Sequence, residues 1–255
     1  MMSKIRTIFE AIRVLKNWPL YFADYLGLVR RPSAVFRLRS GVSFSIRPGT
    51  NDRTIFNEIW LSRSYTPLGF EIGEHDTVID IGAHIGFFSV FAAMKAKKGK
   101  VFSFEPVPSN FGILEKNVEL NGLDNVVPIN KAVSSESGTR EMILFGENAA
   151  GHSFAYAASP VKNRINVETV NLGEFIKGNG IRTVDFLKMD CECAEHEILS
   201  HCSPEALRVV RKISMEYHEM DTSRNLASLK LFLERAGFKV SVGAGGGNIL
   251  YAERY

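Results

Sequence analysis

Residues 77–110 constrain the fold of this chain more than any other segment. They open with a short β-branched run at 78–81 that is typical of a strand buried on both faces. A glycine turn at 82–86 then leads into an apolar helix at 87–95, and a second apolar strand ends at Glu105. This order predicts a βαβ unit, because two parallel neighbouring strands need a crossover connection. The N–H groups at the start of the helix favour a ligand bound at the turn.

The spacing of the glycines indicates which ligand the turn accepts. A dinucleotide fingerprint, G-x-G-x-x-G, lets the backbone approach a pyrophosphate closely. The corresponding positions hold Gly82, His84 and Phe87, so only the first is a glycine. Gly82 and Gly86 behind Asp80 instead suit a nucleoside ligand without phosphates, and S-adenosylmethionine is such a ligand. We therefore expect S-adenosylmethionine at this turn, in contact with Asp80, Gly82, Ala83, His84 and Gly86.

Glu105 directly follows the second strand of the unit. In nucleoside sites, a carboxylate at this place accepts hydrogen bonds from the ribose hydroxyls. Glu105 is therefore predicted to bind the ribose of the cofactor. A glycine turn alone could be a simple strand-to-helix connection, and Glu105 is the second observation that favours a cofactor site.

Four stretches of the sequence resemble the FkbM-type S-adenosylmethionine-dependent methyltransferases. They are VIDIGAHIGFFS at 78–89, FSFEPVPSNFGILEKNVELNGL at 102–123, VVPINKAVSS at 126–135 and LKMDCECAEHEIL at 187–199. They follow one another in the order of the family, and the resemblance covers about half of the chain.

The resemblance implies a fold and an activity. The implied fold is α/β: a class I methyltransferase with a Rossmann-like sheet that is mostly parallel and has an antiparallel C-terminal strand. The implied activity is O-methylation of a hydroxyl on a sugar, a glycan or another secondary metabolite. The matching blocks also add Asn110, Lys131, Ala132 and Asp190 to the expected cofactor site.

The chain departs from the family pattern at two positions. The family usually has Asn where this chain has His84. It usually reads D-V-E-G-A-E where this chain reads D-C-E-C-A-E at 190–195, so that Cys193 replaces a glycine. A cysteine places a side chain where the family brings its backbone close to the pocket.

Composition agrees with a soluble enzyme built around one α/β core. The chain has 255 residues, 45% of them hydrophobic, and a formal net charge of +3 that is too small to argue for a nucleic-acid partner. Its cysteines are Cys191, Cys193 and Cys202, an odd number that makes no disulfide framework, so a reducing cytoplasm is expected. No apolar run has transmembrane length.

The first 65 residues are predicted to form an extension of helices and a hairpin, followed by the methyltransferase domain at 66–255. Apolar residues at 5–15 repeat at helical spacing among basic ones, which indicates a basic amphipathic helix. This helix could lie on an anionic membrane surface or pack on the domain or a partner subunit, and we favour packing. A helix at 20–29, a hairpin at 37–47 and a helix at 52–65 follow, the last with Asp52 as its N-cap.

After Glu105, helices and strands alternate. Residues 146–164 are small, polar and without periodicity, so we expect a loop over the site there. The other predicted elements are a helix at 109–120, a strand at 126–130, a hairpin at 133–145, strands at 167–170 and 184–189, a helix at 194–201, a strand at 209–217, a helix at 223–236 and a final hairpin at 238–252.

The chemistry is expected at the carboxyl ends of the fourth and fifth strands, because open α/β sheets bind ligands there. Strand four brings Lys188 and Asp190 to this edge, and strand five brings Glu216 and His218. A hydroxyl is a poor nucleophile at neutral pH, so His218 or Asp190 is the candidate general base, and Glu216 completes the predicted catalytic set. In the simpler alternative, His218 is only a hydrogen-bonded strand-end residue and Lys188 pairs with Glu195 at the surface.

The same residues also allow a metal hypothesis. Asp190 and Glu216 could offer oxygen ligands to Mg²⁺ or Ca²⁺. We expect no metal, because each strand end has one evident carboxylate and such cations prefer more oxygen ligands. Nitrogen and sulfur ligands after strand four match no common zinc spacing; they are Cys191, Cys193, His196, His201 and Cys202.

The sequence also narrows the class of substrate. Enzymes that methylate exocyclic amines of bases carry an Asp/Asn-Pro-Pro-aromatic tetrad after the fourth strand, and residues 190–193 contain no proline. We therefore expect a small-molecule or glycan hydroxyl acceptor and no nucleic acid. The two rival hypotheses are a non-catalytic scaffold of the same fold and an NAD-linked oxidoreductase, which His84 disfavours.

Overall fold

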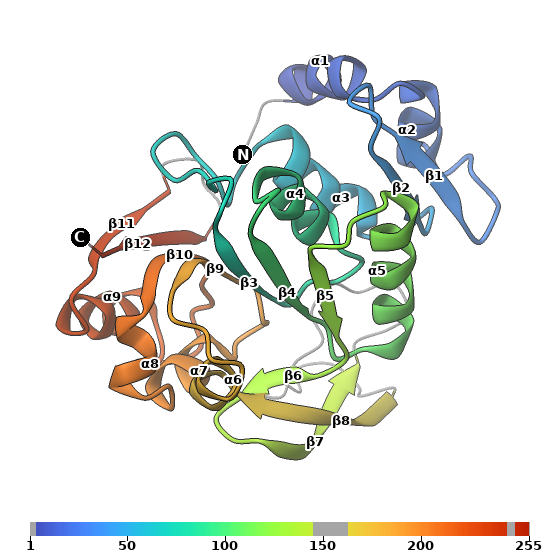
Figure 1. The fold of residues 1–255 in the computed structure, drawn as a ribbon. Helices are drawn as coiled ribbons and strands as arrows, with labels where there is room; N and C mark the ends of the chain where they lie inside the picture. Colours follow the sequence, from blue (N-terminus) through green and yellow to red (C-terminus); the bar gives the residue numbers. More distant parts are fainter. Residues whose placement is uncertain (1–3, 145–162, 244–247, 255) are drawn as a thin grey trace.

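A seven-stranded sheet forms the centre of the protein in the computed structural model, which describes residues 4–144, 163–243 and 248–254 (Figure 1). In spatial order its strands are β11 (Lys239–Val242), β12 (Ile249–Glu253), β10 (Val210–Glu216), β9 (Val184–Met189), β3 (Thr77–Ile81), β4 (Lys100–Phe104) and β5 (Val126–Ile129). Strands β10, β9, β3, β4 and β5 are parallel, whereas β12 runs antiparallel to both β10 and β11. The predicted α/β fold, a mostly parallel sheet with an antiparallel C-terminal strand, is therefore confirmed.

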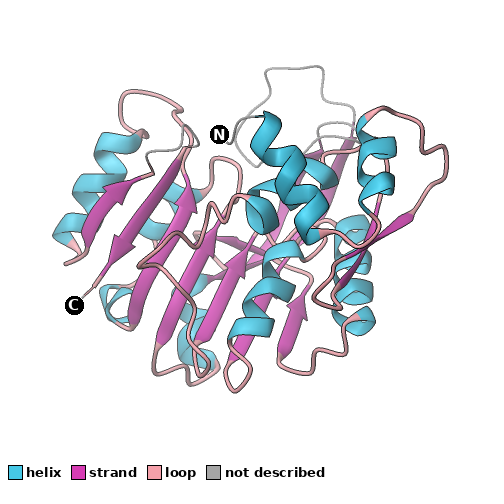
Figure 2. Ribbon diagram, turned by 90° about the horizontal axis from the view of Figure 1, so that it is seen from above, coloured by secondary structure: helices cyan, strands magenta, loops and turns pink. Residues whose placement is uncertain are grey.

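Helices cover both faces of this sheet (Figure 2). Because successive side chains of a strand point to opposite faces, Val78 joins one hydrophobic cluster and Ile79 joins the other. The cluster with Val78 includes α4 (Phe87–Lys95) and α5 (Pro108–Leu120). The cluster with Ile79 includes α6 (Leu172–Gly178), α7 (Glu195–Ser200), α8 (Pro204–Arg208) and α9 (Leu226–Arg235).

The N-terminal extension packs on the α4 face of the sheet. It consists of α1 (Lys4–Val14), α2 (Trp18–Tyr25), the antiparallel pair β1 (Ala34–Arg37) and β2 (Ser43–Ile46), α3 (Asp52–Phe56) and the π-helix η1 (Asn57–Leu61). Its aromatic rings reach α4: the Phe44 and Phe87 centroids lie 4.8 Å apart, and Trp60 Nε1 donates to the Phe87 carbonyl at 3.1 Å. The extension and the sheet thus share one hydrophobic cluster. The domain boundary after residue 65 stays a prediction.

The helix predicted at 52–65 differs from the observed one. The α-helical part ends at Phe56, five residues of π-helix follow, and the N-cap is Asn51 rather than Asp52. Asp52 is fully buried, and its carboxylate binds the backbone N–H and the guanidinium of Arg47 at 2.7 and 2.8 Å. The prediction of Asp52 as the N-cap is wrong, because its carboxylate binds Arg47 in a charge-assisted pair instead of the N–H groups at the start of the helix.

The hairpin predicted at 133–145 is also wrong. Its two halves form β6 (Ala132–Ser134) and β7 (Gly138–Leu144), but β8 (Asn163–Asn171) lies between them, parallel to β6 and antiparallel to β7. Residues 163–169 of β8 pair with β7, and residues 169–171 pair with β6. Thr169 Oγ1 also donates to the Glu136 carbonyl at 2.9 Å. The loop predicted at 146–164 lies outside the described residues except for its last two positions, which begin β8.

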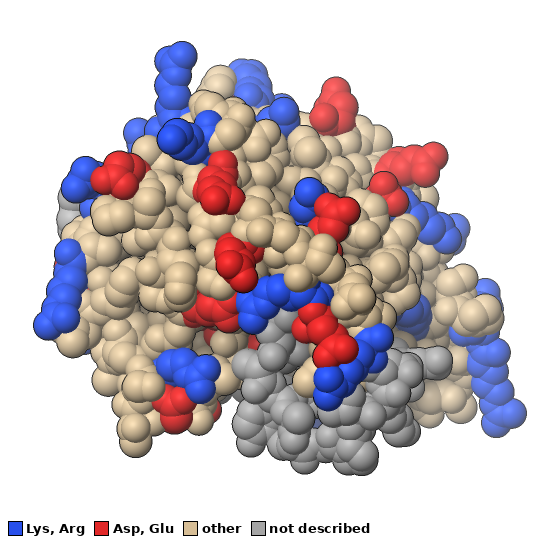
Figure 3. Space-filling view, turned by 90° about the horizontal axis from the view of Figure 1, so that it is seen from below, with Lys and Arg blue, Asp and Glu red and all other residues tan. Residues whose placement is uncertain are grey.

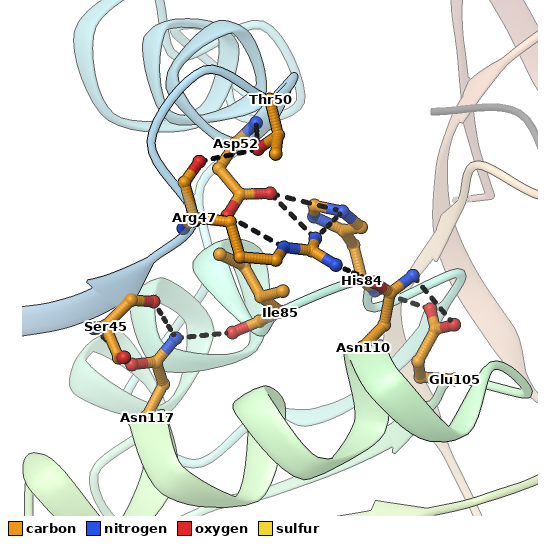
Figure 4. Close-up of polar contacts among 9 residues, drawn as sticks. All are labelled: Ser45, Arg47, Thr50, Asp52, His84, Ile85, Glu105, Asn110 and Asn117. Carbon is orange, nitrogen blue, oxygen red and sulfur yellow. Dashed lines mark hydrogen bonds and ion pairs between the residues drawn. The ribbon is translucent and has the colours of Figure 1, made fainter. Parts of the chain in front are cut away.

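Asn117 on α5 ties the extension to the glycine turn. Its side chain is fully buried, accepts from the Ser45 N–H at 2.7 Å, and donates to the Ile85 carbonyl at 2.8 Å and the Ser45 carbonyl at 3.2 Å (Figure 4). Three backbone groups therefore depend on one amide side chain.

We predict that Asn117→Ala lowers the free energy of unfolding by about 3 kcal/mol, because it leaves buried backbone groups unpaired. Urea unfolding followed by circular dichroism measures this loss. Asn179→Ala removes one exposed bond to the Phe175 carbonyl and serves as the control, with a loss of less than about 0.5 kcal/mol. Equal losses in the two variants would contradict the role given to Asn117.

Candidate active site

Lys188 at the end of β9 is the buried centre of the site. Its ammonium donates to the Gly82 carbonyl at 2.8 Å and lies 3.3 Å from Asp80 Oδ1 and 3.7 Å from Asp190 Oδ2. Burial acts to lower the pKa of Lys188, but the charges of Asp80 and Asp190 outweigh it and raise the pKa above its ordinary value. The alternative of a surface pair between Lys188 and Glu195 is wrong, because both side chains are buried and bind other partners.

The glycine turn lies against the end of β9. Gly82 has a φ of +75°, and a Cβ at this position would lie 1.8 Å from the carbonyl oxygen of Asp190. A side chain therefore cannot be accommodated there without moving the backbone. The Asp190 N–H also donates to the Ile81 carbonyl at 3.0 Å. These contacts hold the cofactor turn and the predicted catalytic strand end together.

Glu105 is a buried acceptor with capacity left for a ligand. Its carboxylate accepts from the backbone N–H groups of His84 and Val107 at 2.8 and 2.9 Å and from Asn110 Nδ2 at 3.3 Å. A carboxylate has about four acceptor positions, so roughly one remains for a ribose hydroxyl. Burial raises the pKa of Glu105 to about 7, although the hydrogen bonds act to lower it.

Arg47 of the extension connects these elements (Figure 4). Its guanidinium donates to Asp52 Oδ1 at 2.8 Å and to Asn110 Oδ1 at 2.7 Å, and its Nη2 lies 2.9 Å from His84 Nε2. Burial lowers the pKa of His84 to about 4, so the ring is neutral and Nε2 accepts from Arg47. The extension thereby orients both the glycine turn and the neighbour of Glu105.

The positions where the chain departs from the family pattern have left-handed backbone. His84 has a φ of +53° and Cys193 a φ of +77°. Asn and Gly, the usual family residues there, tolerate this region best. The backbone has therefore kept the conformation that the family residues favour, while the side chains differ.

A cavity of about 310 Å³ opens at this edge of the sheet. Of the predicted residues, Gly82, His84, Glu105, Asn110, Lys131, Ala132, Asp190 and Glu216 line it. Asp80 is buried in β3 and Ala83 is buried within the turn, while Gly86 packs on α5, where an added Cβ would meet Leu114 Cδ1 at 2.6 Å. These three residues support the turn rather than line the cavity.

The cavity wall is acidic. Among the described residues that line it, the carboxylates belong to Glu58, Glu105, Asp190, Glu192 and Glu216, and the lysine is Lys131. A cationic sulfonium and ammonium fit such a wall, whereas a pyrophosphate would be repelled. The apolar part of the wall, with Phe104, Val107 and Val133, suits an adenine ring. The residues present therefore fit S-adenosylmethionine and disfavour NAD.

His218 is held between two carboxylates. Its Nδ1 lies 3.1 Å from Glu195 Oε1, and its Nε2 lies 3.4 Å from Glu192 Oε2. Burial acts to lower its pKa, but the hydrogen bonds and charges of these carboxylates raise the pKa to about 11. A protonated imidazole has no free nitrogen lone pair that could accept another proton, so this arrangement argues against His218 as the general base. The catalytic role of His218 stays a prediction.

A second, larger cavity of about 870 Å³ adjoins the first. The two cavities share Thr54, Glu58 and Glu216, which therefore lie at their junction. Burial, followed by the charge of Asp190, raises the pKa of Glu58 to about 7 and that of Glu216 to about 7. Glu58 was not predicted from the sequence, although it is the one carboxylate that follows Asp52 in the helix predicted at 52–65.

The carboxylate of Asp190 already has partners within the protein. Its Oδ2 accepts from the Tyr65 hydroxyl at 3.0 Å and faces the Lys188 ammonium. Among the residues that the structure describes, no group of three or more His, Cys, Asp or Glu side chains is arranged to hold a metal ion.

We predict that S-adenosylhomocysteine raises the melting temperature of the protein and that NAD does not. Glu105→Ala should weaken S-adenosylhomocysteine binding at least about tenfold, because one hydrogen bond to a charged group contributes roughly 1.5–3 kcal/mol. Isothermal titration measures the affinity, with Glu234→Ala, an exposed partner of Lys230 on α9, as the control. An unchanged affinity in Glu105→Ala would refute the assignment of Glu105.

Comparison with known proteins identifies the family. The profile of the methyltransferase FkbM domain matches residues 80–240. The 31-O-demethyl-FK506 methyltransferase FkbM of Streptomyces tacrolimicus is 26% identical over 232 residues, which cover 80% of this chain and 88% of that relative. Methyltransferase sdnD of Sordaria araneosa is 25% identical over 221 residues, which cover 73% of this chain and 82% of the relative. A crystal structure of M. jannaschii TYW2 in complex with AdoMet aligns with a TM-score of 0.46 and 16% identity over 89% of each chain.

The family match spans more than half of the chain and contains the glycine turn, Glu105 and Asp190. The predictions of the family and of its cofactor, S-adenosylmethionine, are therefore confirmed. This chain belongs to the FkbM family of S-adenosylmethionine-dependent methyltransferases.

Proposed function

We propose that this methyltransferase methylates a hydroxyl oxygen of an acceptor bound in the larger cavity. The observation that carries the proposal is the position of Glu58 and Glu216, which line the cofactor cavity and the larger cavity at once. An acceptor bound in the larger cavity can therefore place a hydroxyl group at the junction with the cofactor cavity, beside these two carboxylates. Hydroxyl groups need a proton acceptor at this point, since they are poor nucleophiles at neutral pH.

We place the proton acceptor in this carboxylate pair. A general base is most effective when its pKa lies near the working pH, and both carboxyls have a pKa raised to about 7. Bound S-adenosylmethionine supplies a sulfonium methyl group, which becomes the methyl ether and leaves S-adenosylhomocysteine. The hydroxyl proton passes to a carboxylate of the pair, and Tyr65 and Lys188 hold Asp190 beside it.

The acceptor class is a sugar, a glycan or another hydroxylated metabolite. Four tyrosines line the larger cavity, and their rings can pack against the apolar faces of such molecules; they are Tyr21, Tyr25, Tyr65 and Tyr251. The name of the Streptomyces relative, 31-O-demethyl-FK506 methyltransferase, describes a substrate that lacks a methyl group on an oxygen atom. This name supports transfer to oxygen. A cation ligated by Asp190 is not part of the proposal, because the Lys188 ammonium already faces this carboxylate.

The product tests the reaction class. The protein is incubated with ¹³C-methyl-labelled S-adenosylmethionine and a panel of sugars, glycans and hydroxylated metabolites. Carbon NMR of the labelled product then distinguishes a methyl ether from an N-methyl or C-methyl group. A labelled methyl ether supports the proposal, and a label on nitrogen or carbon contradicts it.

We predict that turnover rises with pH through about 7 and then levels off, because a carboxyl accepts a proton only when it is ionised. Glu216→Gln or Glu58→Gln should lower kcat by roughly 10²- to 10⁴-fold and leave S-adenosylhomocysteine affinity nearly unchanged. The control is Glu115→Gln, an exposed carboxyl on α5. If both junction variants keep more than a tenth of the activity and His218→Gln does not, the base is His218.

A further inference from the structure

Helix α1 turns its largest apolar side chains outward. Ile5 and Phe9 are each 68% exposed, and Ile8 and Ile12 are exposed as well. Their spacing of three and four residues places them on one stripe of the helix. The helix instead buries Ala11 against the protein. An amphipathic surface helix normally does the reverse, so this stripe has an unusual orientation for a helix in contact with water alone.

Neighbouring residues enlarge the stripe into a patch. Exposed large apolar side chains continue on α2 and in the segment after it, and Figure 1 shows α1 and α2 beside each other. We call the whole set the N-terminal patch: Ile5, Ile8, Phe9, Ile12, Trp18, Tyr25, Leu26 and Leu28. Only four other large apolar side chains of the described residues are exposed, at positions 68, 120, 231 and 242. Concentrated exposure of this kind marks an interaction site.

The charge around the patch is positive. Residues 4–31 carry six basic side chains, namely Lys4, Arg6, Arg13, Lys16, Arg30 and Arg31, and two acidic ones, Glu10 and Asp24. Asp24 is buried, and Glu10 is bound to Arg13 at 2.6 Å. The opposite side of the molecule, shown in Figure 3, instead presents residues of both signs interspersed. A basic apolar surface complements an anionic one.

We propose that the N-terminal patch docks the enzyme peripherally on an anionic phospholipid bilayer. Interfacial helices insert apolar side chains at the headgroup boundary while basic residues bind anionic lipids, and Trp and Tyr favour the same depth. A second copy of the chain fits this face less well, because the two positive surfaces would repel each other. No helix in the described part of the chain is long and apolar enough to cross a membrane.

The N-terminal patch lies beside the larger cavity. Four residues of α1 form part of its wall: Lys4, Arg6, Thr7 and Ile8. Tyr25 of the patch lines the same cavity. A docked bilayer therefore lies next to the cavity in which the proposed function places the acceptor. The docking itself does not depend on that function, and its test needs no acceptor.

Sedimentation with vesicles tests the proposal on the full chain. We expect binding to vesicles of phosphatidylcholine mixed with phosphatidylglycerol, and little binding to phosphatidylcholine alone. The bound fraction should fall as salt is raised, because the attraction is partly between charges. Phe9→Ser should reduce the partition coefficient at least about tenfold through the loss of one inserted apolar side chain. Leu231→Ser, at a 48% exposed position on α9, serves as the control and should bind as the wild type does.

Circular dichroism verifies that Phe9→Ser is folded, and Ile5→Ser replaces it if it is not. Three results would overturn the proposal: no binding to the anionic vesicles, equal binding by the Phe9 and Leu231 variants, or a dimer in light scattering that Phe9→Ser dissociates. The last result would assign the patch to a second copy of the chain. If the protein binds the anionic vesicles but forms no methyl ether with any acceptor, only the proposed function is refuted.

Discussion

The buried ammonium of Lys188 is the interaction on which the site depends. It joins the carbonyl of the glycine turn, the carboxylate of Asp80 below the turn and the carboxylate of Asp190 at the end of β9. A buried charge needs such partners, because desolvation would otherwise drive it to its neutral form. The cofactor turn on β3 and the acidic strand end on β9 are therefore fixed relative to each other by one side chain.

The N-terminal extension contributes directly to this site. Arg47 contacts His84 and Asn110, and Tyr65 donates to Asp190. Glu58 comes from the π-helix, a type of helix that occurs frequently at functional sites. The extension thus provides one of the two junction carboxylates, while the sheet provides the other, Glu216. Both parts pack in the same hydrophobic cluster.

Local sequence patterns predicted the parts of the structure that local forces determine. The βαβ unit, the final hairpin, the glycine turn and Glu105 all followed from short motifs, because periodicity and turn residues act over a few positions. The place of β8 between β6 and β7, the π-helix at Glu58 and the burial of Asp52 with Arg47 were missed. Contacts between distant segments accompany each of them: β8 pairs with β6 and β7, the π-helix packs on α1 and α4, and Arg47 also binds His84 and Asn110. Neither propensity nor spacing reports such contacts.

The most direct test of this account is the stability and cofactor affinity of Lys188→Met. We expect the free energy of unfolding to fall by about 3–5 kcal/mol, since Asp80 would keep a buried charge without its partner. S-adenosylhomocysteine affinity should fall at least about tenfold, because the turn and β9 would no longer be held together. Lys230→Met on α9, whose side chain is 49% exposed, is the control and should cost less than about 1 kcal/mol. Wild-type stability and affinity in Lys188→Met would contradict the central role of this ammonium.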